Sequence, residues 1–156
     1  MELVSVDPGL RGCGIAHWRG TNLVLAKYVV NPHGSVWYEM VTAVEVVVGP
    51  VMYIHHLAIE MPQAYIHRKG DQNDLLTLAG LVGAFTYFFS RCGGHFTLYR
   101  PAEWKGQVPK EITEKRARAR LSTEELKRIK LPSASLRHNV WDAIGIGLHH
   151  LSRAPT

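Results

Sequence analysis

Three acidic residues lie in apolar surroundings, where an unpaired carboxylate is energetically costly. Asp7 and Glu60 each end a short hydrophobic run, and Asp142 lies in the apolar stretch near the C-terminus. Carboxylates brought together repel, and one would stay protonated unless a cation intervened. Their oxygens suit Mg²⁺ or Mn²⁺, and two such ions about 4 Å apart can activate a water and stabilise the leaving oxygen of a phosphodiester. We therefore predict a metal-dependent site for phosphodiester hydrolysis.

This site requires elements that bring the three acids together. Residues 3–7 and 53–60 are short, buried strands by pattern, and a proline follows each of them closely. If the two strands are adjacent and parallel, Asp7 and Glu60 meet at the edge where open α/β sheets bind ligands. A helix crossing that edge would add Asp142, with His138 and Asn139 on roughly the same helical face. A simpler interpretation of Asp7 alone is that it caps its own turn.

The pattern over the whole chain predicts one α/β domain spanning residues 1–156. Strands are expected at 3–7, 12–18, 23–30, 53–60 and 95–99, and the first three form an antiparallel meander. Helices are expected at 36–48, 75–91 and 136–151, with one or two short helices in between. The result is a mixed five-stranded sheet of order βββαβαβα, flanked by helices.

The positive charge is regional. The net charge is +5, and residues 100–130 hold ten Lys or Arg against five Glu, which accounts for the whole excess. A regional excess favours a surface that binds a polyanion such as nucleic acid, with a solvated helix face as the simpler alternative.

Several classes are disfavoured by composition. No run of about 18 apolar residues exists, so a membrane span is not expected. The N-terminus reads as a strand and not as a signal peptide. Cys13 and Cys92 are too few for a zinc site and are expected to be reduced thiols. We therefore expect a cytoplasmic protein without membrane association.

The stretch 75–91 is apolar on nearly every side, which indicates a helix buried on every side. In a small domain this favours a subunit interface, and Gly80 and Gly83 would let a partner helix approach closely. A central helix in a monomer is the alternative. The pairs His55-His56 and His149-His150 have no other potential metal ligands beside them in the sequence. We interpret them as surface residues or as hydrogen-bonded core residues.

Three motifs together resemble the RuvC-type Holliday junction resolvases of the ribonuclease H-like superfamily, and their order and spacing fit over essentially the whole chain. They are Asp7-Pro8-Gly9-Leu10-Arg11-Gly12-Cys13-Gly14-Ile15-Ala16, then Ile59-Glu60, then His138-Asn139-Val140-Trp141-Asp142-Ala143. Trp104-Lys105-Gly106 and the stretch around Asp142 look more like phage-type or divergent members. The resemblance implies a ribonuclease H-like fold.

The resemblance also implies a ligand set for two Mg²⁺ or Mn²⁺ ions. Asp7, Glu60 and Asp142 would be metal ligands. The fourth ligand in the family is usually Asp or His, three residues before the last Asp. Here that position is Asn139, which offers a carbonyl oxygen but no charge, so Asn139 is expected as a ligand or a supporting group. His138 could ligate instead, or could position the scissile phosphate.

The implied activity is a crossover junction endonuclease that acts as a homodimer and nicks four-way DNA junctions symmetrically. The helix at 75–91 would form the dimer face. The loop after Glu60 would contact the junction centre through Tyr65, unless that tyrosine is simply packed in the loop. Trp104 could stack on a base, although a core anchor is the preferred interpretation. The expected DNA-binding residues are Tyr65, Arg68, Lys69, Lys105, Lys110, Lys115, Arg116 and Arg118.

Three alternatives remain open at this stage. A ribonuclease H-like nuclease could act on flaps, forks or RNA–DNA hybrids with the same site. A catalytically weakened module could bind branched DNA without cutting it, and Asn139 gives weight to that alternative. Half of an actin-like sugar kinase shares the Asp-x-Gly turn, but one domain of this length has no second lobe to close over ATP.

Overall fold

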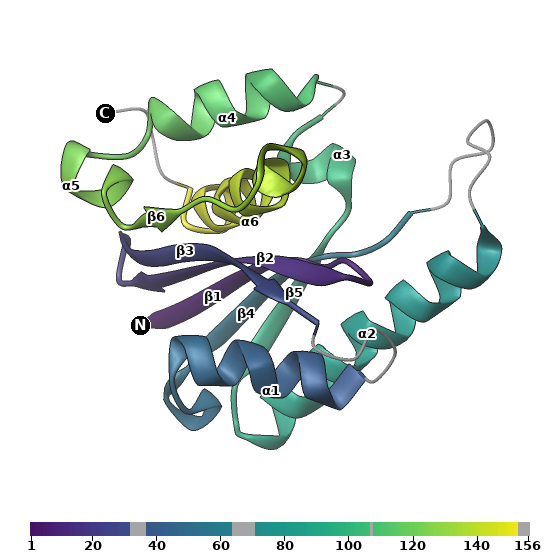
Figure 1. The fold of residues 1–156 in the computed structure, drawn as a ribbon. Helices are drawn as coiled ribbons and strands as arrows, with labels where there is room; N and C mark the ends of the chain where they lie inside the picture. The colour runs from purple at the N-terminus through teal and green to yellow at the C-terminus, as the bar shows by residue number, and fades with distance from the viewer. Residues whose placement is uncertain (32–36, 64–70, 107, 153–156) are drawn as a thin grey trace.

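The computed structural model describes residues 1–31, 37–63, 71–106 and 108–152. These residues form a mixed six-stranded sheet between two layers of helices (Figure 1), in the strand order β5-β4-β1-β2-β3-β6. The α/β class and the flanking helices are therefore as predicted. The strands are β1 (Glu2–Asp7), β2 (Gly12–Arg19), β3 (Asn22–Val30), β4 (His56–Glu60), β5 (His95–Tyr99) and β6 (Ile129–Lys130).

The pairing of the strands confirms the arrangement that the acids require. β1, β2 and β3 form the antiparallel meander, and β1 pairs in parallel with β4, which pairs in parallel with β5. The expected strand count of five was one too low. β6 has only two residues and pairs with β3 at Ala26 and Lys27, so it has no alternating pattern of its own in the sequence.

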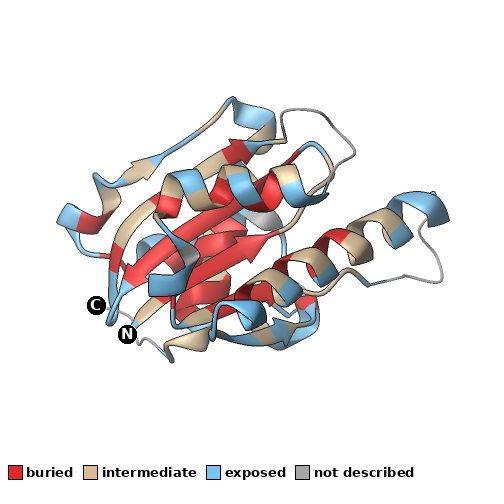
Figure 2. Ribbon diagram, turned by 90° about the horizontal axis from the view of Figure 1, so that it is seen from below, coloured by how far each residue is buried: buried red, intermediate tan, exposed pale blue. Residues whose placement is uncertain are grey.

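Helices cover both faces of the sheet. On one face lie α1 (Trp37–Val48) and α2 (Gln72–Arg91), and on the other lie α4 (Lys110–Arg118) and α6 (Arg137–His150) (Figure 1). Because side chains alternate along a strand, the sheet contributes to two cores. Val4, Val6 and Ile59 face α1 and α2, whereas Leu3, Ala16 and Ala58 face α6. Figure 2 shows the buried residues concentrated in the central strands, with the far end of α2 exposed.

The remaining elements are short. The turn η1 (Val51–Tyr53) occupies the beginning of the stretch expected to be a strand, so β4 begins at His56. α3 (Pro101–Trp104) and α5 (Thr123–Leu126) lie in the basic segment, and η2 (Ala134–Leu136) precedes α6. Ser122 is the N-cap of α5, where Ser122 and Glu125 form a reciprocal capping box. Among the described residues, no helix combines the length and hydrophobicity that a bilayer span requires.

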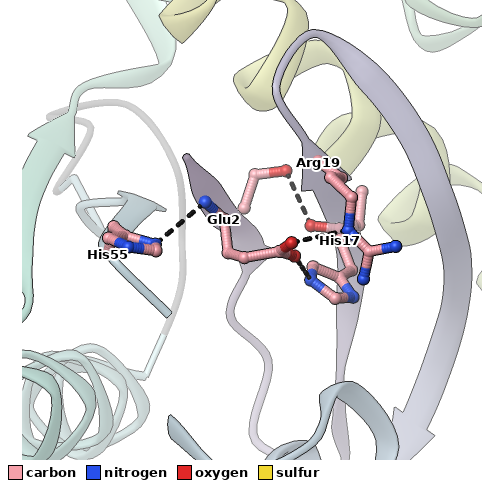
Figure 3. A network of polar contacts seen from close by, with 6 residues as sticks. Glu2, His17, Arg19 and His55 are labelled. Carbon is pink, nitrogen blue, oxygen red and sulfur yellow. Dashed lines mark hydrogen bonds and ion pairs between the residues drawn. The ribbon is translucent and has the colours of Figure 1, made fainter. Parts of the chain in front are cut away.

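The register of β1 is fixed at its N-terminal end by a polar network (Figure 3). The Glu2 carboxylate accepts from Arg19 Nε at 2.7 Å and contacts His17 Nε2 at 2.6 Å. The backbone N–H of Glu2 donates to Nδ1 of His55 at 3.0 Å, and the N–H of His55 donates back to the Glu2 carbonyl at 2.9 Å. β1 is thereby tied to both of its neighbours, which sets where its other end lies relative to them.

Candidate active site

The first two acids lie side by side at the C-terminal ends of β1 and β4. The parallel register pairs Val6 with Ile59, so the next positions along the two strands are Asp7 and Glu60. Both lie on the α6 face of the sheet, because Leu3 and Ala58 of the same alternating sets belong to the core under α6. Asp7 is 9% exposed. Asp7 and Glu60 therefore end adjacent parallel strands, as predicted.

The third acid reaches this edge because α6 approaches the sheet closely. Gly14, which pairs across the strands with Asp7, lies directly under the N-terminal turn of α6. A Cβ at Gly14 would collide with the carbonyl group of Asn139, so only glycine permits this approach. Asp142 follows three residues later and is 5% exposed. His138 and Asn139, one turn before Asp142, are half-buried on the same helix.

Lys105 lies among the acids. Its Nζ is 3.0 Å from Oδ2 of Asp142 and 3.5 Å from Oε2 of Glu60, and its side chain is 23% exposed. Burial acts to lower the pKa of Lys105, but attraction to Asp142, Glu60 and Asp7 outweighs it and raises that pKa above its usual value. Lys105 was predicted as a DNA-binding residue, and that role stays a prediction; the structure places its ammonium beside Glu60 and Asp142.

Trp104 holds Glu60 in place. Its indole Nε1 donates a 2.8 Å hydrogen bond to Oε2 of Glu60. The indole ring packs against Gly145 of α6, where a Cβ would overlap the ring. Trp104 also packs against the core under α6, so the core-anchor interpretation is confirmed.

The electrostatic balance at Glu60 is unfavourable to its charged form. Burial raises the pKa of Glu60, while Lys105 and the Trp104 N–H act to lower it and Asp142 acts to raise it, and the net direction is upward. Extra positive charge near Glu60 would therefore stabilise its ionised form.

The donor chemistry of the site suits a hard divalent cation. The carboxylates of Glu60 and Asp142 contact one cationic group, the ammonium of Lys105, and Asp7 at the end of the neighbouring strand attracts it. Within the described ranges, however, no group of three or more His, Cys, Asp or Glu side chains is arranged to hold a metal ion. The lysine therefore provides the positive charge that these acids share here.

The basic segment divides into two kinds of cation. Lys115 and Arg116 are exposed on α4, as a DNA-binding role requires. Arg118 is exposed too, but it pairs with Glu114 at 2.9 Å and its guanidinium lies 4.5 Å from the ring centre of Trp141. It therefore contributes to holding α4 on α6.

A small pocket lies between Lys105 and α4. Lys105, Arg116 and Arg120 line it together with Thr113. The Thr113 hydroxyl is buried and has no hydrogen-bond partner in the described part of the chain. Lys105, Arg116 and Arg120 give this pocket a positive lining, which is suited to phosphate oxygens.

Some predicted DNA contacts lie outside the described residues. These are Tyr65, Arg68 and Lys69, together with the side chain of Lys110.

The histidines predicted to be surface or core residues have protein partners. His56 Nε2 lies 2.9 Å from the hydroxyl of Thr97, and Nδ1 of His150 lies 2.9 Å from the hydroxyl of Tyr99. The rings of His56 and His150 stack with their centres 4.4 Å apart. Burial, reinforced by the neighbouring histidines, lowers the pKa of both.

Sequence reasoning missed three features of the site: the ammonium of Lys105 among the acids, the Trp104 hydrogen bond to Glu60, and the close approach at Gly14. One signal was available for the first two. α3 begins immediately after β5, whose last residue, Tyr99, pairs with Glu60. Residues one turn beyond Tyr99 therefore had to lie near the acids.

No protein-family model matches the sequence, and no curated protein matches it. Solved structures do match it. RuvC of Thermus thermophilus in complex with a Holliday junction substrate aligns over 96% of this chain and 92% of its own, with a TM-score of 0.65 and 18% identity.

Two further structures extend the comparison. The fowlpox virus resolvase with Holliday junction DNA aligns over 96% of this chain and 98% of its own, with a TM-score of 0.62 and 12% identity. The yeast mitochondrial Holliday junction resolvase aligns over 96% and 77%, with a TM-score of 0.55 and 9% identity. The chain therefore has the fold of these resolvases, and the predicted ribonuclease H-like fold is confirmed.

Proposed function

We propose that the protein is a metal-dependent, structure-specific DNA endonuclease that resolves four-way junctions. The observation that carries the proposal is that Asp7 and Glu60 end adjacent parallel strands, while Glu60 and Asp142 contact the same ammonium, at the sheet edge of a fold shared with junction resolvases. Two of the similar structures are complexes with Holliday junction DNA. The substrate of those proteins is brought to this chain as part of the proposal.

Asp7, Glu60 and Asp142 would hold Mg²⁺ or Mn²⁺, with Asn139 as a neutral oxygen donor. A bound divalent ion would supply an activated water and stabilise the charge that develops on the leaving oxygen. The chain's own residues position these groups. Trp104 orients Glu60 through its N–H, and Gly14 sets the distance of α6 from the sheet. His138, one helical turn before Asp142, would position a phosphate held at the same edge.

The cations beside the site would bind the DNA backbone. Arg116, Arg120 and Lys115 have no acidic partner among the described residues, and two of them line the pocket that adjoins Lys105. Neutralising phosphates in this way releases counterions, so binding should weaken steeply with salt.

A homodimer would allow paired nicks, because a four-way junction offers two equivalent strands to two equivalent sites. Exposed apolar side chains on α1 and α2 would support a second copy, among them Tyr38, Val46, Leu76 and Tyr87. Gly80, expected to face a partner helix, instead receives the ring of Trp37 within the chain, whereas Gly83 has open space beside it. Sedimentation at micromolar concentration tests the dimer, and a monomer would contradict paired nicking.

The decisive experiment is a substrate panel of four-way junction, flap, fork, RNA–DNA hybrid and duplex, each incubated with Mg²⁺ and with Mn²⁺. We expect symmetric nicks in the junction, and we expect Asp7→Asn to abolish cutting while it spares binding. Robust cutting by Asp7→Asn would refute the metal-ligand assignment. Preferential cutting of flaps, forks or hybrids would keep the nuclease and change the substrate.

A second candidate function is a module that binds branched DNA with weakened or no catalysis. Two observations favour it: Asn139 brings no charge to the site, and Lys105 neutralises part of the charge that is present. Tight junction binding without cutting in either metal would select this alternative.

A further inference from the structure

Lys105 places a positive charge in the candidate site. Its ammonium contacts Asp142 at 3.0 Å and Glu60 at 3.5 Å. All three site acids attract it, including Asp7. A cation in contact with two carboxylates takes the place of a cation that these acids would otherwise recruit from solution.

The backbone holds Lys105 in this position. α3 follows β5 at once, with Pro101 buried at its first turn and a capping interaction between Arg100 and Glu103. Lys105 ends this helix, and its N–H donates to the Pro101 carbonyl at 3.1 Å. Its Nζ also lies 4.6 Å from the ring centre of Trp104, which is itself fixed against α6. The ammonium is therefore not the free end of a surface side chain.

The charges of the site balance with one divalent ion. Asp7, Glu60 and Asp142 together carry three negative charges when ionised, and Asn139 adds none. Lys105 and a single divalent ion carry three positive charges. A second divalent ion would leave an excess of two positive charges in a half-buried site before any DNA is bound, which is unfavourable.

We propose that Lys105 acts as the second cation of the site, so that each chain binds one divalent metal ion and not two. This inference rests on the proposed function only in taking the three acids as metal ligands. It concerns the DNA-free protein, so it can be tested without any cleavage.

The test counts Mn²⁺ bound to the DNA-free protein, by calorimetric titration and by the electron paramagnetic resonance signal of free Mn²⁺. We expect one Mn²⁺ per chain in the wild type. Lys105→Met keeps the length of the side chain and removes its charge. This variant should bind a second Mn²⁺, or should bind the first at least about tenfold more tightly. Removing one positive charge a few ångströms from the metal would give a gain of this size even in water.

Lys115→Met is the matched control, because Lys115 is an exposed lysine of the same segment with no acidic partner among the described residues. It should bind Mn²⁺ as the wild type does. A second readout needs no metal titration: without metal, Lys105→Met should melt at a lower temperature than Lys115→Met, and Mn²⁺ should restore most of the difference. The stoichiometry of the wild type stands as a test even if Lys105→Met does not fold.

The outcomes separate this inference from the proposed function. Two Mn²⁺ of similar affinity on the wild type would overturn the inference and leave the nuclease proposal intact. Wild-type binding unchanged in Lys105→Met would also overturn it. One Mn²⁺ on the wild type without cutting of any branched substrate would support the inference and count against the nuclease. No Mn²⁺ bound at millimolar concentration would refute both.

Discussion

The close contact between Gly14 and α6 offers the sharpest test of how the site is built. Gly14 lies across from Asp7 in the sheet, and a Cβ there would overlap the carbonyl group of Asn139. Both overlapping groups belong to regular elements, so neither can move alone. Gly14 does not have a positive φ, and therefore Gly14→Ala introduces a steric conflict without backbone strain.

The size of the effect follows from this overlap. To restore a normal contact, α6 must move away from β2 by about 1 Å or more, and it carries Asp142 with it. Overpacking of this kind costs about 1–3 kcal/mol in the free energy of unfolding. A displacement of about 1 Å in a catalytic group can lower the rate by about 100-fold. DNA affinity should change less than the cleavage rate, because the cations of α4 are exposed and α4 packs on α6, so the two helices can move together.

Three measurements on one preparation check this prediction: chemical denaturation, junction cleavage and junction binding. Gly83→Ala is the control, because Gly83 lies in α2 with nothing within 4 Å of an added Cβ. It should be neutral or more stable by about 0.5–1 kcal/mol, because alanine is the better helix former. A Gly14→Ala variant as stable and as active as the wild type would refute the argument. Lower stability with full cleavage would show that this contact does not place Asp142.

Three further predictions follow from the geometry. Arg116→Ala should weaken DNA binding and reduce the slope of log affinity against log salt by about one unit. Lys127→Ala is the control: it removes a cation paired with Glu124 and should change the slope less. Equal slopes for the two variants would contradict the pocket as a phosphate contact. The pKa of His56 and His150 is lowered in the folded protein, so the stability they contribute is present above the usual histidine value of 6.5 and is lost as pH falls below it. Melting curves should therefore shift to lower temperature below about pH 6.5, and His150→Gln should shift less; an unchanged profile would argue against this pair. Burial raises the pKa of Cys13 to about 12, so a thiol reagent at pH 8 should label one cysteine in the native protein and two after denaturation, and rapid labelling of both would show that Cys13 is accessible.

The sequence alone was sufficient to identify the acids and the strands that carry them. β1, β2 and β5 follow from short apolar runs bounded by turn residues, because that local pattern is set by the chain itself. The adjacency of Asp7 and Glu60 also followed, since both end strands in an α/β pattern whose parallel members meet at one edge. The N-terminus of α5 is likewise local, because its capping box lies within four residues, Ser122 to Glu125.

Features that depend on contacts between distant segments could not be predicted in this way. β6 pairs with β3 because the buried carboxylate of Glu125 accepts from the N–H of Leu23 at 2.8 Å, and Arg128 donates to the Leu23 carbonyl at 2.7 Å. These residues are about a hundred positions apart, and the two residues of β6 carry no periodicity. Its existence is therefore a property of the folded chain.

Lys105 is the clearest example of a feature that depends on contacts between distant segments. By sequence it is one of ten cations in a basic segment, and most of the others that the structure describes are exposed. Lys105 differs from the other cations for two reasons: α3 turns immediately after β5, and Trp104 packs against Gly145. Both depend on where α6 crosses the sheet. The sequence determined which acids could meet, because strand ends and helix faces are local. Only the tertiary structure decided which cation lies among them, because the direction of one side chain depends on the packing of three separate elements.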